Sequence, residues 1–194
     1  SSATICSVIG TAVVVAVRKS KGFFKKTLEG VSLLPEMLPS IVLVIGIMLF
    51  WNAIYKVIPL YNTIWIMVLA YVVLYLPYTV QYVTSAFNQI NDSLLQAGRV
   101  FGGTPAYVFR RVTLPMISRG IFAGWMMIFI IAFRELVTSS LIAPPNTLVV
   151  STYINREFEQ GSVSLGMAMA VLCVLITTTA LLVFNRLVGK QKGA

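Results

Sequence analysis

The feature that most constrains this chain is its series of long apolar runs, each separated from the next by a short polar stretch. Apolar residues make up 58% of the 194 residues and charged residues only 11%, whereas soluble domains contain roughly 45 to 50% apolar residues. Each run approaches the ~20 residues that a helix needs to cross a bilayer. Lipid offers no partner to backbone polar groups, so a crossing segment must be a helix or part of a closed barrel. The sequence therefore predicts an all-α, polytopic membrane protein.

Five membrane spans are predicted, and they place residues 1–194 in a single transmembrane domain. The first apolar run starts almost at residue 1 without a charged region before it, so it does not have the pattern of a signal peptide. We expect the chain to be a fragment, or the C-terminal half, of a longer protein with at least one further helix upstream. The predicted spans are about Ala3 to Val17, Pro39 to Trp51 with a few flanking residues, Thr63 to Gln81, Ile117 to Leu141, and Val163 to Leu187.

The basic residues are concentrated in alternate connections between these spans. The connection after the first span holds five of the fifteen, the connection after the third span holds four, and the C-terminal tail holds three. Because loops rich in Lys and Arg stay on the cytoplasmic side, these segments, and the C-terminus with them, are predicted to be cytoplasmic. This orientation explains the net charge of +9 more economically than nucleic-acid binding does, so we expect no nucleic-acid partner.

The sequence lacks the side chains that most catalytic and metal sites need. It contains no histidine, which removes the usual proton shuttle and any Ser-His-Asp arrangement. Its two cysteines, Cys6 and Cys173, lie inside apolar runs, where free thiols pack as small hydrophobic groups. The phosphate-binding pattern Gly-x4-Gly-Lys-Ser/Thr does not occur. We therefore expect no catalytic residue, no metal site and no ATP-binding site in this chain.

The longest polar stretch, residues 85–119, is predicted to be a cytoplasmic loop that begins with a short helix. Ser93 and Gln96 have the spacing of a capping box, in which the serine caps the first free amides and the glutamine reaches back. Gly102 and Gly103 are expected to end this helix, because glycine accepts the left-handed conformation that is common just past a helix C-terminus.

A second short helix is predicted to follow at once in the same loop. Thr104 is its cap, Pro105 stands at its first position, and Pro115 limits its length. Two short helices with small residues between them suit an element that docks on a partner subunit. The same pattern, with its arginines, equally suits an amphipathic pair lying on anionic lipid headgroups.

The residues of this loop resemble the EAA signature of type I ABC importer permeases, which reads Glu-Ala-Ala, three residues, Gly, nine residues, Ile-x-Leu-Pro. The spacing agrees throughout, but two residue types differ from the family pattern: a glutamine replaces the acidic residue and a glycine replaces the second alanine. The matching positions are Gln96, Ala97, Gly98, Gly102, Val112, Leu114 and Pro115.

This resemblance implies a mechanism and a set of partners. The loop would insert into a cleft of a separate ATP-binding subunit, which holds ATP and Mg, so the chain itself needs no cofactor. Gly102 would be the glycine of close contact, and Gln96 would offer a neutral hydrogen bond where the family has a charged group. The resemblance further implies an external substrate-binding protein, a second permease half supplied by a homodimer or a fused homologous half, and the inner membrane of a bacterial cell.

A pair of charged residues, Arg134 and Glu135, interrupts the fourth predicted span, and ionisable groups inside a membrane segment are candidates for a functional site. Glu135, Thr138 and Ser139 share one helix face at positions i, i+3 and i+4. Such a polar face would find no hydrogen-bond partners in lipid. We favour a lining of the transport pathway or a buried pair between helices over snorkelling of the charges to the outer interface.

The segment from Phe133 to Leu141 is similar to the ferric-ion branch of the same permeases, which implies Fe(III) as a substrate. The superfamily branch also includes permeases for polyamines, sulfate, thiamine and phosphonates. Glu135 is the only carboxylate within a predicted span, so the chain has no oxygen-ligand set that would select iron. The loop before the fifth span is expected to be either a solvated connection or a surface for the external binding protein. A membrane enzyme or an ATP-independent channel is a weaker interpretation, because neither needs the loop signature.

Overall fold

The fold is entirely helical in the part of the chain that the computed structural model describes, residues 1–145, 147 and 149–190. Among the described residues, four helices are long and apolar enough to cross a membrane, and a fifth span is counted if residues 22–37 and 40–53 form one broken span. These four are Ser2–Lys19, Ile64–Asn88, Pro105–Phe133 and Val163–Phe184. The prediction of an all-α protein with about five spans is therefore confirmed.

The chain divides into two compact units. The first unit contains Ser1–Ser2, Pro35–Leu74 and Phe129–Ala194, and the second unit contains Ala3–Leu34 and Tyr75–Ile128. Helix α4 (Ile64–Asn88) and helix α7 (Leu114–Phe133) each contribute residues to both units.

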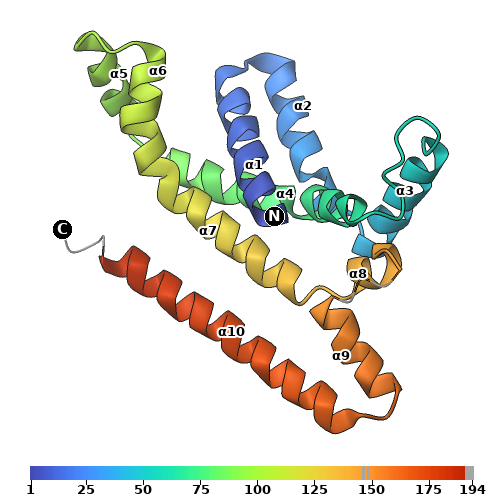
Figure 1. The fold of residues 1–194 in the computed structure, drawn as a ribbon. Helices are drawn as coiled ribbons and strands as arrows, with labels where there is room; N and C mark the ends of the chain where they lie inside the picture. Colours follow the sequence, from blue (N-terminus) through green and yellow to red (C-terminus); the bar gives the residue numbers. More distant parts are fainter. Residues whose placement is uncertain (146, 148, 191–194) are drawn as a thin grey trace. The chain divides into compact units, whose positions relative to one another are not determined.

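The second unit is built on α1 (Ser2–Lys19), α2 (Gly22–Leu33), the C-terminal part of α4 and the first part of α7 (Figure 1). Its core is mostly aliphatic and includes Val14 of α1, Val83 of α4 and Ile117 of α7, all nearly fully buried. The hydroxyl of Thr4 on α1 accepts a hydrogen bond of 3.1 Å from the indole nitrogen of Trp125 on α7. The spans predicted at Ala3 to Val17 and Thr63 to Gln81 are both present, each longer by a few residues.

Glycines bring the helices of the second unit close together. A Cβ atom at Gly10 of α1 would lie only 2.6 Å from Thr79 Cγ2 of α4. At Gly120 of α7 a Cβ atom would lie 2.9 Å from the Tyr82 carbonyl oxygen and 2.5 Å from Ala86 Cβ. Small residues in these positions let helix backbones approach closely, which is the usual source of attraction between helices in lipid.

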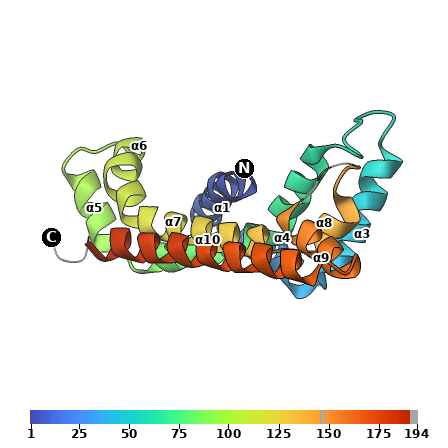
Figure 2. The ribbon, with the colours of Figure 1, turned by 60° about the horizontal axis from the view of Figure 1, so that its bottom comes forward.

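The first unit contains α3 (Ser40–Ala53), α8 (Val137–Ile142), α9 (Val150–Glu159) and α10 (Val163–Lys190). Helix α3 packs on α8, and α9 packs on α10. Gly161, with a φ of +84°, makes the turn between α9 and α10 that is visible in Figure 2. The most apolar stretch of α10 contains no residue buried against the rest of the described chain.

Two connections that the sequence analysis treated as loops are helical. Helix α2 occupies most of the basic connection after the first span, and the 3-10 helix Leu34–Met37 follows it. Helix α9 occupies the connection before the last span. Pro39 immediately precedes the first residue of α3, a position where a proline removes no intrahelical hydrogen bond.

Candidate coupling loop and pathway residues

The polar loop begins with α5 (Asp92–Val100), as predicted, but a different residue caps it. The side-chain oxygen of Asn91 accepts a hydrogen bond of 3.1 Å from the Ser93 backbone amide. The prediction that Ser93 is the cap was therefore wrong, since Ser93 already lies inside the helix. Asparagine caps a helix as well as serine does, and spacing alone favoured the serine because Gln96 follows it at the right distance.

Two adjacent glycines shape the turn after α5 in different ways. Gly102 has a φ of +83°, and a Cβ atom there would meet nothing within 4 Å. Gly103 donates a backbone hydrogen bond of 3.1 Å to the Gly98 carbonyl, and a Cβ atom at Gly103 would lie 2.5 Å from that same oxygen. Within the loop, Gly102 therefore supplies a left-handed backbone and Gly103 supplies the close contact. The helix ends at these glycines as predicted.

The second helix of the loop starts as predicted but does not stop at Pro115. Thr104 Oγ1 accepts a hydrogen bond of 3.3 Å from the Tyr107 amide, and Pro105 is the first residue of α6 (Pro105–Val108). A π-helix, Phe109–Thr113, then leads directly into α7. The Leu114 amide donates a hydrogen bond to the Phe109 carbonyl, five residues earlier. This π-helical pattern lets the helix continue past Pro115, which has no amide hydrogen to donate. The prediction that Pro115 limits the helix was wrong.

The tip of the loop exposes apolar side chains. Val100 is 84% exposed and Phe101 is 90% exposed, and Tyr107 on α6 is 60% exposed. Figures 1 and 2 both show α5 and α6 side by side, and a cavity of about 440 Å³ lies between Phe101, the two glycines and Tyr107. Exposed apolar patches of this kind mark contact sites.

The other residues of the signature lie along the same loop. Gln96 and Ala97 are exposed on α5, and Gly98 is half-buried because its Cα faces Val108 of α6. Val112 is half-buried in the π-helix, whereas Leu114 and Pro115 are exposed at the start of α7. The predicted loop residues thus lie along one continuous stretch that runs from α5 through the π-helix to the start of α7.

Glu135 lies in a break between α7 and α8, in the first unit. Its carboxylate accepts hydrogen bonds from the Thr138 amide at 2.9 Å and from the Ser139 amide at 3.3 Å. Its backbone carbonyl accepts bonds from the hydroxyls of Ser139 at 2.8 Å and of Ser151, on α9, at 2.6 Å. The continuous helix predicted from Ile117 to Leu141 was therefore wrong, and Glu135 caps a short helix instead of lining one face with Thr138 and Ser139.

The residues around this cap differ in exposure. Thr138 and Ser139 are fully buried, and the Thr138 hydroxyl makes no hydrogen bond within the described residues. The Tyr71 side chain, also buried, lies within electrostatic reach of Glu135. Arg134 is exposed. In the described part of the chain, no group of three His, Cys, Asp or Glu side chains is placed to hold a metal ion.

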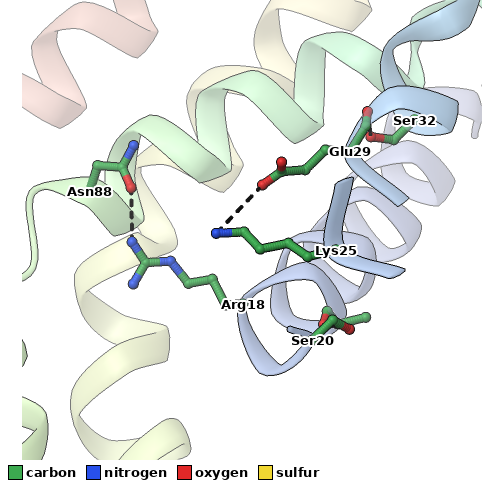
Figure 3. Close-up of polar contacts among 7 residues, drawn as sticks. Arg18, Ser20, Lys25, Glu29, Ser32 and Asn88 are labelled. Atoms are coloured by element: carbon green, nitrogen blue, oxygen red, sulfur yellow. Dashed lines mark hydrogen bonds and ion pairs between the residues drawn. The ribbon is translucent and has the colours of Figure 1, made fainter. Parts of the chain in front are cut away.

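The C-terminal part of α4 carries a polar face that was not predicted from the sequence. It borders a cavity of about 420 Å³ between α1, α2 and α4. Glu29, which lines this cavity, pairs with Lys25 one turn earlier on α2 at 3.9 Å, and Arg18 of α1 donates a hydrogen bond of 2.8 Å to Asn88 (Figure 3). The residues of the polar face stand at positions i, i+3, i+4 and i+7, so the sequence already indicated that they share one helix face. Its residues are Gln81, Thr84, Ser85 and Asn88.

These features define a helical membrane protein with a two-helix loop that leads into one of its spans. Residues 8–192 match the family described as binding-protein-dependent transport system inner membrane component, and the chain belongs to that family. It is therefore a multi-pass membrane permease component of an ABC import system, and the resemblance to type I ABC importer permeases is confirmed.

Known relatives transport several kinds of substrate. The spermidine/putrescine permease protein PotC of Haemophilus influenzae is 22% identical over 192 residues, which is 99% of this chain and 73% of PotC. The Fe(3+)-transport permease protein FbpB 2 of the same organism is 27% identical over 135 residues, 70% of this chain and 27% of that protein. The trehalose permease protein SugB of Mycobacterium tuberculosis is 28% identical over 197 residues, 98% of this chain and 70% of SugB.

A solved structure confirms the fold. A bacterial ABC transporter involved in the import of the acidic polysaccharide alginate superposes with a TM-score of 0.73 at 15% identity. The match covers 96% of this chain and 76% of the transporter chain. The relatives together do not single out the ferric-ion branch.

Proposed function

We propose that this chain forms the transport pathway of an ABC importer and is driven through residues 92–115, the coupling loop, by ATP hydrolysis in a separate subunit. The observation that carries this proposal is the apolar tip of the loop, where Val100 and Phe101 are 84% and 90% exposed. The neighbouring Gly102 leaves open space beside this tip. A partner that covers the tip removes apolar surface from water, which favours association.

The connection between the coupling loop and the membrane supports a mechanical role. Residues 105–133 form one helical run that starts in the loop and continues through a membrane span. A helix resists bending over this length, so a push on Pro105 by the partner moves the cytoplasmic end of α7. ATP and Mg bind to the partner in this mechanism, and the permease contributes no catalytic residue.

A pair of matched variants tests the docking surface. Val100→Asp places a charge at the tip of the coupling loop, whereas Val57→Asp places the same charge at a valine that is 81% exposed between α3 and α4. We expect Val100→Asp to abolish co-purification of the ATP-binding subunit and ATP-driven uptake, and Val57→Asp to leave both unchanged. Both variants should insert in the membrane at normal levels. Co-purification that survives in Val100→Asp would refute the docking surface.

The proposed assembly requires further partners. The coupling loop and C-terminus lie on the cytoplasmic side of the bacterial inner membrane in this proposal, and α9 faces the external binding protein on the opposite side. A second permease half, from a homodimer or a fused homologous half, closes the pathway. The uncovered apolar stretch of α10 supports contact with lipid or with that second half.

Two polar regions are assigned to the pathway. The face of α4 that includes Gln81 and Ser85 borders a cavity in its C-terminal part, and we assign it to the cytoplasmic side of the pathway. The predicted residues Arg134, Glu135, Thr138 and Ser139 are assigned to its outer side. There Glu135 holds α8 in place through its bonds to the helix amides, so it acts as a positioning residue.

Two observations bear on the substrate. The segment from Phe133 to Leu141 resembles the ferric-ion branch, and the Fe(3+) permease matches 70% of the chain, which favours Fe(III). The polyamine permease matches 99% of the chain, which favours a polyamine. Uptake of radiolabelled Fe(III) and of spermidine by cells that express the complete importer separates them. Fe(III) uptake that excess spermidine does not inhibit would support iron as the substrate. Spermidine uptake without Fe(III) uptake would reject iron.

A further inference from the structure

A third cavity, of about 630 Å³, lies within the second unit between the end of α1, the end of α4 and the coupling loop. Its size is that of a pocket for a small ligand. Most of its wall is apolar, and the proposed docking of the ATP-binding subunit at Val100 and Phe101 makes no use of it. The lining includes three basic residues and three apolar ones: Arg18, Lys19, Arg99, Val15, Phe87 and Phe109.

The charged residues of this cavity are all basic. Arg18 and Lys19 come from the last turn of α1 and Arg99 comes from the last turn of α5, and none of the lining residues whose side chains the structure describes is a carboxylate. Arg18 is held in position, because it bonds to Asn88 and its guanidinium carbon lies 4.9 Å from the centre of the Phe87 ring. The cavity therefore combines a cationic rim with an apolar wall.

Segments that contain the cavity residues, or follow them in the sequence, have the character of a headgroup region. Val15 and Phe87 belong to membrane-spanning helices, so the apolar wall extends to the edge of the hydrocarbon. Helix α2, which follows α1 directly, starts with Phe23 and Phe24, 86% and 62% exposed, beside several lysines. Exposed aromatic rings beside lysines are typical of segments that lie among lipid headgroups.

We propose that this cavity binds an anionic phospholipid of the cytoplasmic leaflet. The lipid phosphate contacts the cations Arg18, Lys19 and Arg99, and an acyl chain follows the apolar wall past Val15 and Phe87. Basic pockets between transmembrane helices on the cytoplasmic side suit anionic headgroups. An acidic segment of a partner protein would match the charge but not an apolar wall that reaches membrane depth. The assignment to the cytoplasmic leaflet rests on the membrane orientation in the proposed function. The binding site itself rests only on the cavity and its basic residues.

Native mass spectrometry of the purified full chain tests this proposal directly. The chain in a neutral detergent is titrated with short-chain phosphatidylglycerol, and with phosphatidylcholine of the same chain length for comparison. We expect preferential retention of phosphatidylglycerol. The double variant Lys19→Gln with Arg99→Gln should weaken retention roughly 25-fold, about fivefold for each charge. The matched control, Lys21→Gln with Lys26→Gln, removes the same charge outside the cavity and should retain the lipid as the unaltered chain does.

A second variant and two competitors keep the test decisive. Lys19→Arg with Arg99→Lys keeps the charge, so it should keep the lipid even if the neutral variant folds poorly. Equal retention of the two lipids, or equal losses in the neutral variant and its control, would overturn the proposal. Displacement of the lipid by inorganic phosphate at the same concentration would identify a soluble anion instead, and displacement by the ATP-binding subunit would identify a protein contact. The assay needs neither ATP nor transport, so a failure of coupling in Val100→Asp leaves its outcome unaffected.

Discussion

At the scale of single residues, neighbouring positions of the same type have separate physical roles. Gly102 is needed for its backbone angle, because φ is +83° and the space around its Cα is open. Gly103 is needed for its size, because the Gly98 carbonyl lies where a Cβ atom would be. Gly98 stands where the family signature has alanine, and a Cβ atom there would meet only the side chain of Val108, at 3.2 Å.

This difference predicts the order of effects in an alanine series through the coupling loop. Gly103→Ala should disrupt the loop, because a backbone oxygen cannot move away as a side chain can, and overpacking costs about 1 to 3 kcal/mol. Gly98→Ala should be tolerated, because Val108 can shift by a few tenths of an ångström. ATPase activity of the assembled importer should fall about tenfold or more in Gly103→Ala and less than twofold in Gly98→Ala. Similar activities of the two variants would contradict this assignment.

Glu135 gives a second prediction at the residue scale. Replacing it with alanine removes the acceptor for the Thr138 and Ser139 amides, and the loss of such a cap costs about 1 kcal/mol. Glu135→Gln should lose less, since an amide oxygen still accepts one of these bonds. Thermal unfolding of the purified chain in detergent measures the order of stability of these variants. The control Arg134→Gln, at an exposed residue, should unfold at nearly the same temperature as the unaltered protein. An alanine variant as stable as the glutamine variant would argue against the capping role.

At the scale of elements, hydropathy predicted the spans because lipid forces apolar residues into helices about 20 residues long. The loop helices were predictable from Thr104, Pro105 and the glycine pair, since caps and stops act locally. The break at Glu135 was not predictable, because Ser151, sixteen residues away, helps to hold it through a bond to the Glu135 carbonyl. Helix α9 was missed for a similar reason: its polar sequence reads as a loop until it packs on α10.

The packing of α1, α4 and α7 predicts which glycines within helices tolerate a methyl group. Gly10→Ala and Gly120→Ala should destabilise the protein by about 1 to 3 kcal/mol, because their Cβ atoms would lie 2.6 Å from Thr79 and 2.9 Å from the Tyr82 carbonyl. Gly120→Ala should be the worse of the two, since the obstacle is backbone. Gly46→Ala in α3 meets nothing within 4 Å and should be neutral or stabilising. Unfolding temperatures in detergent would show this ranking, and an equal loss in all three would disprove it.

At the scale of the whole molecule, the proposal depends on which side of the membrane the coupling loop occupies. Lys19 ends the first spanning helix and Lys56 lies between α3 and α4, so the two are expected on opposite sides. In a chain with Cys6→Ala and Cys173→Ala, a membrane-impermeant maleimide should label Lys56→Cys in spheroplasts. It should label Lys19→Cys only after the membrane is permeabilised. The opposite pattern would reverse the assigned orientation.

The most direct test of the central claim is cross-linking of the coupling loop to its partner in the membrane. In the same cysteine-free background, Phe101→Cys should give a cross-linked product that contains the ATP-binding subunit when a short bifunctional thiol-to-amine reagent is added. Val57→Cys should give no such product. A product from Val57→Cys, or none from Phe101→Cys in an importer that still transports, would contradict the docking of this loop on the ATPase.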